Sequence, residues 1–369
     1  MSQAILKYLS NLPGWRTNRK IVVIESDDWG SIRMPSNNAR EKLDKHGLNL
    51  DKGKESYRYN LYDTLASAED LEALFETLSS FKDKNGKPPV FTAVSLVANP
   101  DFEKIKETNY LQYFYEPFTN TLARYQQENV WSMWQQGKEE GLFHPEFHGR
   151  EHLNVPVWLR ALQQGNRETL LAFEQGCWGF KNKHQFGIKY QAAFALEKEV
   201  DIPFQKQAIE EGLELFESLH GSKAEFFVPP NGPFNNSLEK VASQKGIKYM
   251  SASKIQREEL GEGKTRKVLH WLGQKNKQGQ RYLTRNCFFE PSDASKDWVD
   301  SCLNEIQLAF NWKKPAVISS HRVNFIGGLN EKNRTEGLEQ LKSLLSTILK
   351  KWPEVEFMTS SDLGKLISQ

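Results

Sequence analysis

The sequence predicts an α/β fold in which parallel strands alternate with helices. Seven short apolar runs are candidate strands: 20–26, 88–97, 141–148, 224–230, 247–253, 316–321 and 355–361. Several of them lack a strict alternation of polar and apolar residues, which is typical of strands that are buried on both faces. Amphipathic helical patterns lie between the runs, so we expect a parallel sheet, either open or closed into a barrel.

Four segments show helical periodicity: 68–81, 204–221, 237–246 and 337–352. A length of 369 residues allows two or three domains, but barrel-like α/β folds often exceed about 250 residues as one unit, and we expect one domain over 1–369. The segments 36–66 and 155–205 are polar or helix-rich and contain no clear strand. We interpret them as insertions that extend one face of the domain.

Composition excludes several classes of function. The net charge of +2 provides no broad basic field, and no apolar run is long enough to span a bilayer. Three widely spaced cysteines fit a reducing compartment and argue against a cysteine zinc site. The segment 1–20 lacks a long apolar core, because Lys7 interrupts it. We therefore expect a cytoplasmic protein that binds neither nucleic acid nor membrane, while the oligomeric state stays open.

Histidines provide the first candidate functional residues. His144, His148 and His152 recur every four residues in the segment HPEFHGREH. Residues four apart share one helix face, so two adjacent members could reach one metal ion, although a single histidine is usually structural. His321 ends the apolar run AVISSH, and the pKa of histidine suits a general acid or base.

Two adjacent aspartates, Asp27 and Asp28, follow the apolar run that begins the first strand. Burying carboxylates costs several kcal/mol unless each finds a partner. Neighbouring strand residues point to opposite faces, but at a strand end both could converge on one cleft. One carboxylate could then bind a metal while the other takes a proton from water. The alternative is an ordinary turn or helix N-cap.

A further motif, EFFVPPNGPFN at 225–235, could aim backbone N–H groups at an oxyanion or merely join a strand to a helix. In their order, the motifs resemble those of the polysaccharide deacetylases with the NodB-homology fold, carbohydrate esterase family four. The matching elements are Asp27–Asp28, 148–155, 227–232, Asp297–Trp298 and His321. This resemblance implies a distorted (β/α) barrel of about seven parallel strands with helical insertions.

The resemblance also implies a metal-dependent deacetylase that removes an acetyl group from an N-acetylated or O-acetylated carbohydrate. Asp28, His148 and His152 would hold a divalent metal. Zinc is the default by ligand type, with cobalt, nickel and manganese as alternatives. Asp27 would be the general base and His321 the general acid.

The remaining implied residues support the acid or contact the substrate. Asp297 would orient or tune the acid. The substrate-binding residues would be Trp29, Pro230, Asn231 and Trp298. Trp29 could stack on a sugar face, although aromatic side chains are more often core, and a backbone N–H near Asn231 could stabilise the oxyanion.

The chain departs from the family pattern in its third motif. Val228 stands where the family usually has an arginine that braces the base, and Asn231 stands where an aromatic residue is usual. Arg33, Arg150 and Arg322 are candidate replacements for that arginine. A degenerate site that only binds carbohydrate is therefore one alternative reading.

Two other hydrolase readings stay open. One is an amide or cyclic-imide hydrolase with a non-sugar substrate. The other is an inverted-zincin metalloprotease, because His148, Glu151 and His152 also satisfy the His-x-x-Glu-His pattern. That pattern needs a continuous helix, and Gly149 inside it disfavours this reading.

Overall fold

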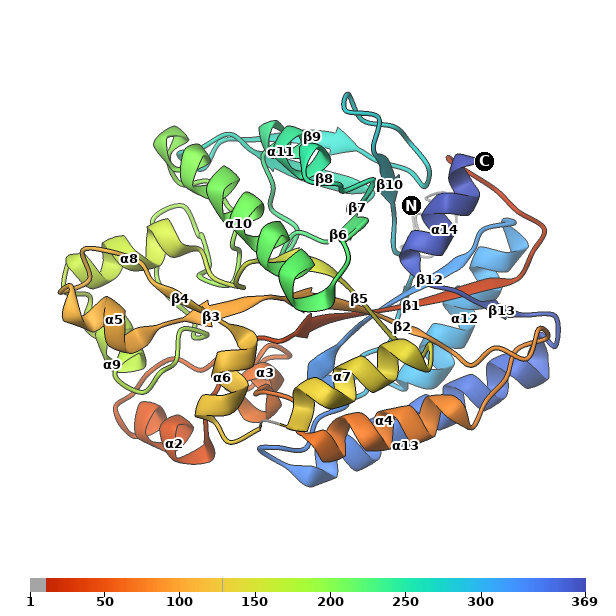
Figure 1. The fold of residues 1–369 in the computed structure, drawn as a ribbon, viewed down its shortest axis with the longest axis horizontal. Helices are drawn as coiled ribbons and strands as arrows, with labels where there is room; N and C mark the ends of the chain where they lie inside the picture. The colour runs from red at the N-terminus through yellow and green to blue at the C-terminus, as the bar shows by residue number, and fades with distance from the viewer. Residues whose placement is uncertain (1–10, 128) are drawn as a thin grey trace.

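A nine-stranded parallel sheet runs through the centre of the molecule in the computed structural model, which describes residues 11–127 and 129–369 (Figure 1). The strand order is β10-β7-β6-β5-β2-β1-β12-β11, and β13 pairs with the start of β1. The strands are β1 (Ile21–Trp29), β2 (Phe91–Leu96), β5 (Phe143–Gly149), β6 (Phe226–Phe227), β7 (Tyr249–Ser251), β10 (Arg281–Leu283), β11 (Cys287–Phe288), β12 (Ala316–His321) and β13 (Glu356–Phe357).

The predicted fold class is confirmed, and each of the seven candidate runs contains a strand. The two further strands, β10 and β11, have only three and two residues and lie within 263–291. The sheet is curled, because Leu283 of β10 and Val317 of β12, near its two ends, belong to one apolar cluster. Within the described residues β10 and β11 do not pair with each other, so the barrel is open.

Side chains of β1 alternate between two cores. Val22 and Ile24 pack in a cluster with the helices α4 and α13, whereas Ile21 and Val23 face Leu363 of the C-terminal helix α14 inside the curl. This alternation is the normal geometry of a strand. It predicts that Glu25 and Asp27, two and four residues beyond Val23, also face the inside.

Helices cover the sheet on both sides (Figure 1). One layer contains α4 (Ala68–Ser79), α7 (Asn129–Glu139), α12 (Trp298–Asn311) and α13 (Glu331–Lys351). The helices α10 (Ile202–His220) and α11 (Glu239–Gln244) pack on β5, β6 and β7 through a separate apolar cluster. Helix α14 (Ser360–Ser368) fills one end of the curl. In the described residues, no helix combines the length and apolarity needed to cross a bilayer.

The segments 36–66 and 155–205 contain helices and no strand. Their α-helices are α2 (Asn37–Lys45), α3 (Tyr57–Tyr62), α8 (Val155–Gln163), α9 (Arg167–Phe173) and the first turn of α10. Leu43 and Leu50 share one apolar cluster with Trp158 and Phe173, so the two segments pack against each other. Their description as insertions on a single domain stays a prediction.

The remaining elements are short. They are the antiparallel pairs β3 (Ala98–Pro100) with β4 (Tyr115–Pro117) and β8 (Ile255–Glu259) with β9 (Thr265–Leu269), the helices α5 (Phe102–Glu107) and α6 (Phe118–Arg124), and the 3-10 turns η1 (Glu199–Asp201), η2 (Asn236–Leu238) and η3 (Arg322–Asn324). The segment 1–10, on which part of the expectation about the N-terminus rests, lies outside the described residues.

Candidate metal centre and active site

A cleft of about 1090 Å³ opens at the carboxyl ends of the parallel strands. The predicted metal ligands, base and acid all line it: Asp28, His148, His152, Asp27 and His321. They come from β1, from the end of β5 and the loop that follows it, and from β12. Asp27 and His321 are also direct partners in the pairing of β1 with β12. The cleft therefore brings together the motifs that are far apart in the sequence.

Asp27 and Asp28 share this cleft because the alternation of β1 breaks between them. Asp28 has a left-handed φ of 76°, which few residues other than glycine adopt and which aspartate tolerates. The register between β1 and β2 also shifts between Ser26 and Trp29, as in a β-bulge. The chain thus turns Asp28 toward the side that Asp27 already faces.

Asp28, His148 and His152 form a three-ligand set. Nε2 of each histidine lies 3.2 Å from Oδ1 of Asp28, and the three ligand atoms lie within 4.8 Å of one another. Burial raises the pKa of Asp28, but the charges and hydrogen bonds of the two histidines outweigh burial and hold that pKa well below its usual range. The carboxylate is therefore ionised, as a metal ligand must be.

The surroundings orient both imidazoles. Nδ1 of His148 donates to the carbonyl oxygen of Val228 at 2.6 Å, so the lone pair of Nε2 faces the site. His152 stacks on Trp178 with ring centroids 6.0 Å apart, and among the described residues its buried Nδ1 has no partner. Two imidazole nitrogens and one carboxylate oxygen are a donor set that zinc accepts, with a fourth position left for water or substrate. The residues thus fit a divalent metal.

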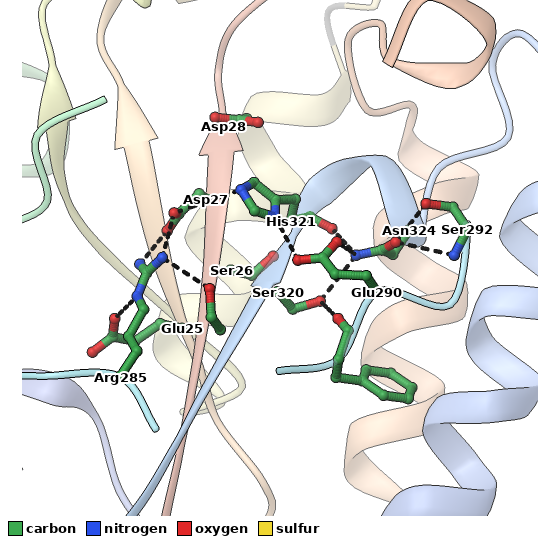
Figure 2. Close-up of polar contacts among 12 residues, drawn as sticks. Glu25, Ser26, Asp27, Asp28, Arg285, Glu290, Ser292, Ser320, His321 and Asn324 are labelled. Carbon is green, nitrogen blue, oxygen red and sulfur yellow. Dashed lines mark hydrogen bonds and ion pairs between the residues drawn. The ribbon is translucent and has the colours of Figure 1, made fainter. Parts of the chain in front are cut away.

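Arg285 braces Asp27 and occupies the role of the arginine that the third motif lacks (Figure 2). Its Nη1 and Nη2 donate to the two carboxylate oxygens of Asp27 at 2.7 and 2.6 Å, while its Nε donates to Glu25 at 2.6 Å. Burial raises the pKa of Asp27, but the Arg285 charge and hydrogen bonds outweigh burial and lower it. Asp27 therefore stays ionised and can accept a proton.

None of the three arginines proposed from the sequence braces Asp27. Arg150 pairs with Glu151, and Arg322 donates to Asp63. Arg33 has no carboxylate within ion-pair distance among the described residues, although it lines the same cleft. The prediction was wrong because the true brace lies between two very short strands that the sequence did not reveal.

Glu290 orients His321, in the position that the sequence assigned to Asp297. Nδ1 of His321 lies 2.6 Å from Oε1 of Glu290. Burial lowers the pKa of His321, but the charge and hydrogen bond of Glu290 outweigh burial and raise it to about 9. Asp297 instead caps α12 by accepting from the backbone N–H of Asp300, so its assignment as a support of the acid was wrong.

A second layer of polar contacts holds Glu290 (Figure 2). Oε2 of Glu290 accepts from Asn324 at 2.9 Å and lies 2.9 Å from a guanidinium nitrogen of Arg58. Burial raises the pKa of Glu290, but His321 and Arg58 outweigh it and lower that pKa. Glu290 is therefore ionised beside a protonated His321.

Of the four predicted substrate-binding residues, Asn231 lines the cleft, whereas Trp29, Pro230 and Trp298 do not. Trp29 is 1% exposed and packs edge-on against Phe143, so it belongs to the core and does not face substrate. Trp298 donates its indole N–H to the carbonyl of Asp293 and does not line the cleft. Pro230 is also absent from the cleft wall, whereas Asn231 lines it with a left-handed φ of 57°.

The residues from His144 to His152 do not form a helix. His144 lies near the start of β5 with 43% of its side chain exposed, and His148 lies near the end of the same strand. His152 follows in the loop, which is why it and not His144 joins Asp28. Glu151 is bound to Arg150 at 2.6 Å. The helical rationale was therefore wrong, and the inverted-zincin reading loses the helix that it requires.

Sequence reasoning missed Arg285 and Glu290. Arg285 follows the apolar pair Tyr282 and Leu283, and Glu290 follows Phe288 and its neighbour in β11. A charged residue within two positions of the end of a short apolar run was the available signal. It was weak because strands of two or three residues carry little periodicity.

Comparison with known proteins gives only a distant likeness of fold. No protein-family model and no curated protein matches the chain. One solved structure that matches is a Mycobacterium smegmatis protein described as a polysaccharide deacetylase, which is 11% identical, with 96% of this chain and 93% of that chain covered and a TM-score of 0.46. A second is the Puue allantoinase, which is 10% identical, with 95% of this chain and 91% of that chain covered and a TM-score of 0.46. A third is a family 4 carbohydrate esterase from Streptomyces lividans, which is 12% identical, with 94% of this chain and 96% of that chain covered and a TM-score of 0.35. At these values the likeness supports no statement about activity, which is therefore argued from the site.

Proposed function

We propose that this protein is a metal-dependent hydrolase that removes an acetyl group from an N-acetylated or O-acetylated carbohydrate. The observation that supports this most is the arrangement of one cleft. It combines a three-ligand Asp–His–His set, an aspartate braced by Arg285 and a histidine hydrogen-bonded to Glu290. These are the parts that hydrolysis by activated water requires.

Asp28, His148 and His152 would hold the metal, with zinc as the default. When bound, a divalent metal would polarise the acyl carbonyl and make water a stronger acid. The protein's own groups would move the protons. Asp27 would accept a proton from water in the cleft, because Arg285 keeps its carboxylate ionised.

His321 would donate a proton to the leaving amine or alkoxide. Its Nδ1 is bound to Glu290, so the N–H of Nε2 faces the cleft. That Nε2 lies 3.9 Å from Oδ2 of Asp27, which is longer than a hydrogen bond, so each group remains available to the substrate. A backbone N–H near Asn231 is the proposed further contact for the oxyanion.

Removal of metal tests the reaction class. We expect purified protein loaded with zinc to release acetate from chitin oligosaccharides, to lose this activity after treatment with a chelator, and to regain it on addition of zinc. Activity is measured by enzymatic detection of acetate, with an acetylated hexapeptide and an N-acyl amide as competing substrates. Chelator-resistant hydrolysis, or preference for the peptide or amide, would contradict the proposed function.

The pH profile tests the role of Glu290. Because Glu290 keeps His321 protonated up to a pKa of about 9, activity that needs the acid is expected to fall as pH rises through that value. Glu290→Gln keeps a hydrogen-bond acceptor but removes the charge, so the basic limb of kcat/KM is expected to move by at least about one unit toward lower pH. Glu354→Gln, at an exposed position, is the matched control. An unmoved basic limb would exclude Glu290 as the group that tunes His321.

A further inference from the structure

One wall of the cleft carries unusually many cations. Arg33, Lys54, Lys181 and Lys189 all line it. Two carboxylates accompany them on this wall: Asp51 accepts from Ser56 and lies 3.6 Å from Nζ of Lys181, and Glu55 pairs with Arg58. The wall therefore keeps a positive excess beside the proposed site.

Arg33 is the clearest unmatched group. Its guanidinium lies 4.9 Å from the ring centroid of Tyr59, its Nε is buried, and it has no hydrogen-bond partner among the described residues. By contrast, Arg58, Arg285 and Arg322 each donate to a carboxylate. A buried guanidinium nitrogen without a partner costs free energy, which an anion that reaches it would recover.

The position of Arg33 is fixed by packing. A Cβ built on Gly179 would lie 2.5 Å from Cγ of Arg33, so only glycine allows this close approach. The ring of Tyr59 also supports the guanidinium through a cation–π contact. An arginine held in one conformation loses little entropy on binding a ligand.

Two lysines add a like-charge pair to this wall. The backbone N–H of Lys54 donates to the carbonyl oxygen of Asp51 at 3.0 Å, so both lysines lie beside Asp51, and the Lys181 ammonium lowers the pKa of Lys54. Their one ion pair within the described residues joins Lys181 to Asp51 at 3.6 Å. Neighbouring ammonium groups repel each other, and an anion placed between them removes that repulsion.

This wall adjoins the proposed reacting groups on both sides. The ring of Tyr59 meets the ring of His321 edge-on, with centroids 5.7 Å apart. Gly179, which contacts Arg33, follows Trp178, whose indole stacks on His152. A group bound by Arg33 would thus belong to the same substrate molecule whose acyl group reaches the metal ligands.

We propose that this wall, formed by Arg33, Lys54, Lys181 and Lys189, is an anion subsite, and that the natural substrate carries a carboxylate or phosphate group in addition to its acyl group. This inference rests on the proposed function, because it describes the substrate of that same reaction. Binding of the anion does not require hydrolysis and can be measured separately.

The test uses probes that share one sugar ring and contain no acyl group. Binding of glucose, glucuronate and glucose 6-phosphate is measured by isothermal titration calorimetry at low ionic strength. We expect at least one anionic probe to bind about tenfold or more tightly than glucose, with an advantage that declines as salt is added. The tighter of the two anionic probes identifies carboxylate or phosphate as the preferred group.

Substitutions in the cleft wall test whether the anionic probe binds at the proposed subsite. Arg33→Gln is expected to remove most of the advantage of the anionic probe, and the double variant Lys54→Gln/Lys181→Gln, which changes only exposed side chains, is expected to reduce it. Arg167→Gln, at the exposed start of α9 and outside the cleft, should bind like the original protein. Equal affinity for all three probes, no binding of either anionic probe, or unchanged binding in both cleft variants would overturn the anion subsite. Anion binding without acetate release from any acetylated sugar would leave the subsite standing and refute the proposed function.

Discussion

Asp27→Asn is expected to lower kcat for acetate release by about 10²–10⁴-fold, the usual contribution of a general base. Asparagine keeps the shape of the side chain but cannot accept the proton from water. The loss should appear in kcat more than in KM, because Asp27 would act on water and does not hold the sugar. Steady-state kinetics, together with thermal unfolding to confirm folding, measures both effects.

Asp297→Asn provides the comparison for this variant. Asparagine caps helices about as well as aspartate, so α12 should remain intact. Since Asp297 contacts Asp300 and not His321, its substitution should leave kcat close to the original value. A loss as large as that of Asp27→Asn would restore the role that the sequence assigned to Asp297. A nearly full rate for Asp27→Asn would require another base.

His152→Ala is expected to reduce zinc affinity by more than the roughly 10–100-fold that is typical when only an outer partner of a ligand is lost. The reason is that His152 supplies one of three ligand atoms around Asp28. Equilibrium dialysis with zinc analysis measures this directly and requires no substrate. His144→Ala is the matched control, because it removes the same side chain from the same repeat at an exposed position. Loss of zinc from the His144 variant alone would show that the other histidine pair binds the metal.

The positions of Asp27, Asp28 and His321 were predictable because each ends a strong apolar run. Asp27, Asp28 and His321 follow four or more buried residues of β1 and β12, and such strands must run parallel in an α/β sheet. Their meeting in one cleft follows from topology alone. The turn that lets Asp28 join Asp27 was not predictable, since it depends on the irregular pairing of β1 with β2.

Other features depended on contacts that leave no local pattern. The segment 144–148 was interpreted by its histidine spacing, yet Pro145 within it disfavours a helix, and pairing with β2 fixes it as a strand. Trp29 was a candidate for sugar stacking, but the burial of its indole follows from packing on Phe143. Arg285 reaches Asp27 across 258 positions of the chain. The brace that seemed absent from the third motif is thus present, which weakens the reading of the site as degenerate.

The inward face of β1 also sets an order of events during synthesis. Glu25, which holds one edge of Arg285, accepts a hydrogen bond at 2.8 Å from Ser360, 335 positions later and at the start of α14. The hydrogen bonds that join Asp27 to Arg285, Arg285 to Glu25 and Glu25 to Ser360 can therefore all be present only after the ribosome has released the start of α14. The arginine that braces Asp27 is therefore itself held by a bond that depends on a segment made more than 300 positions after β1.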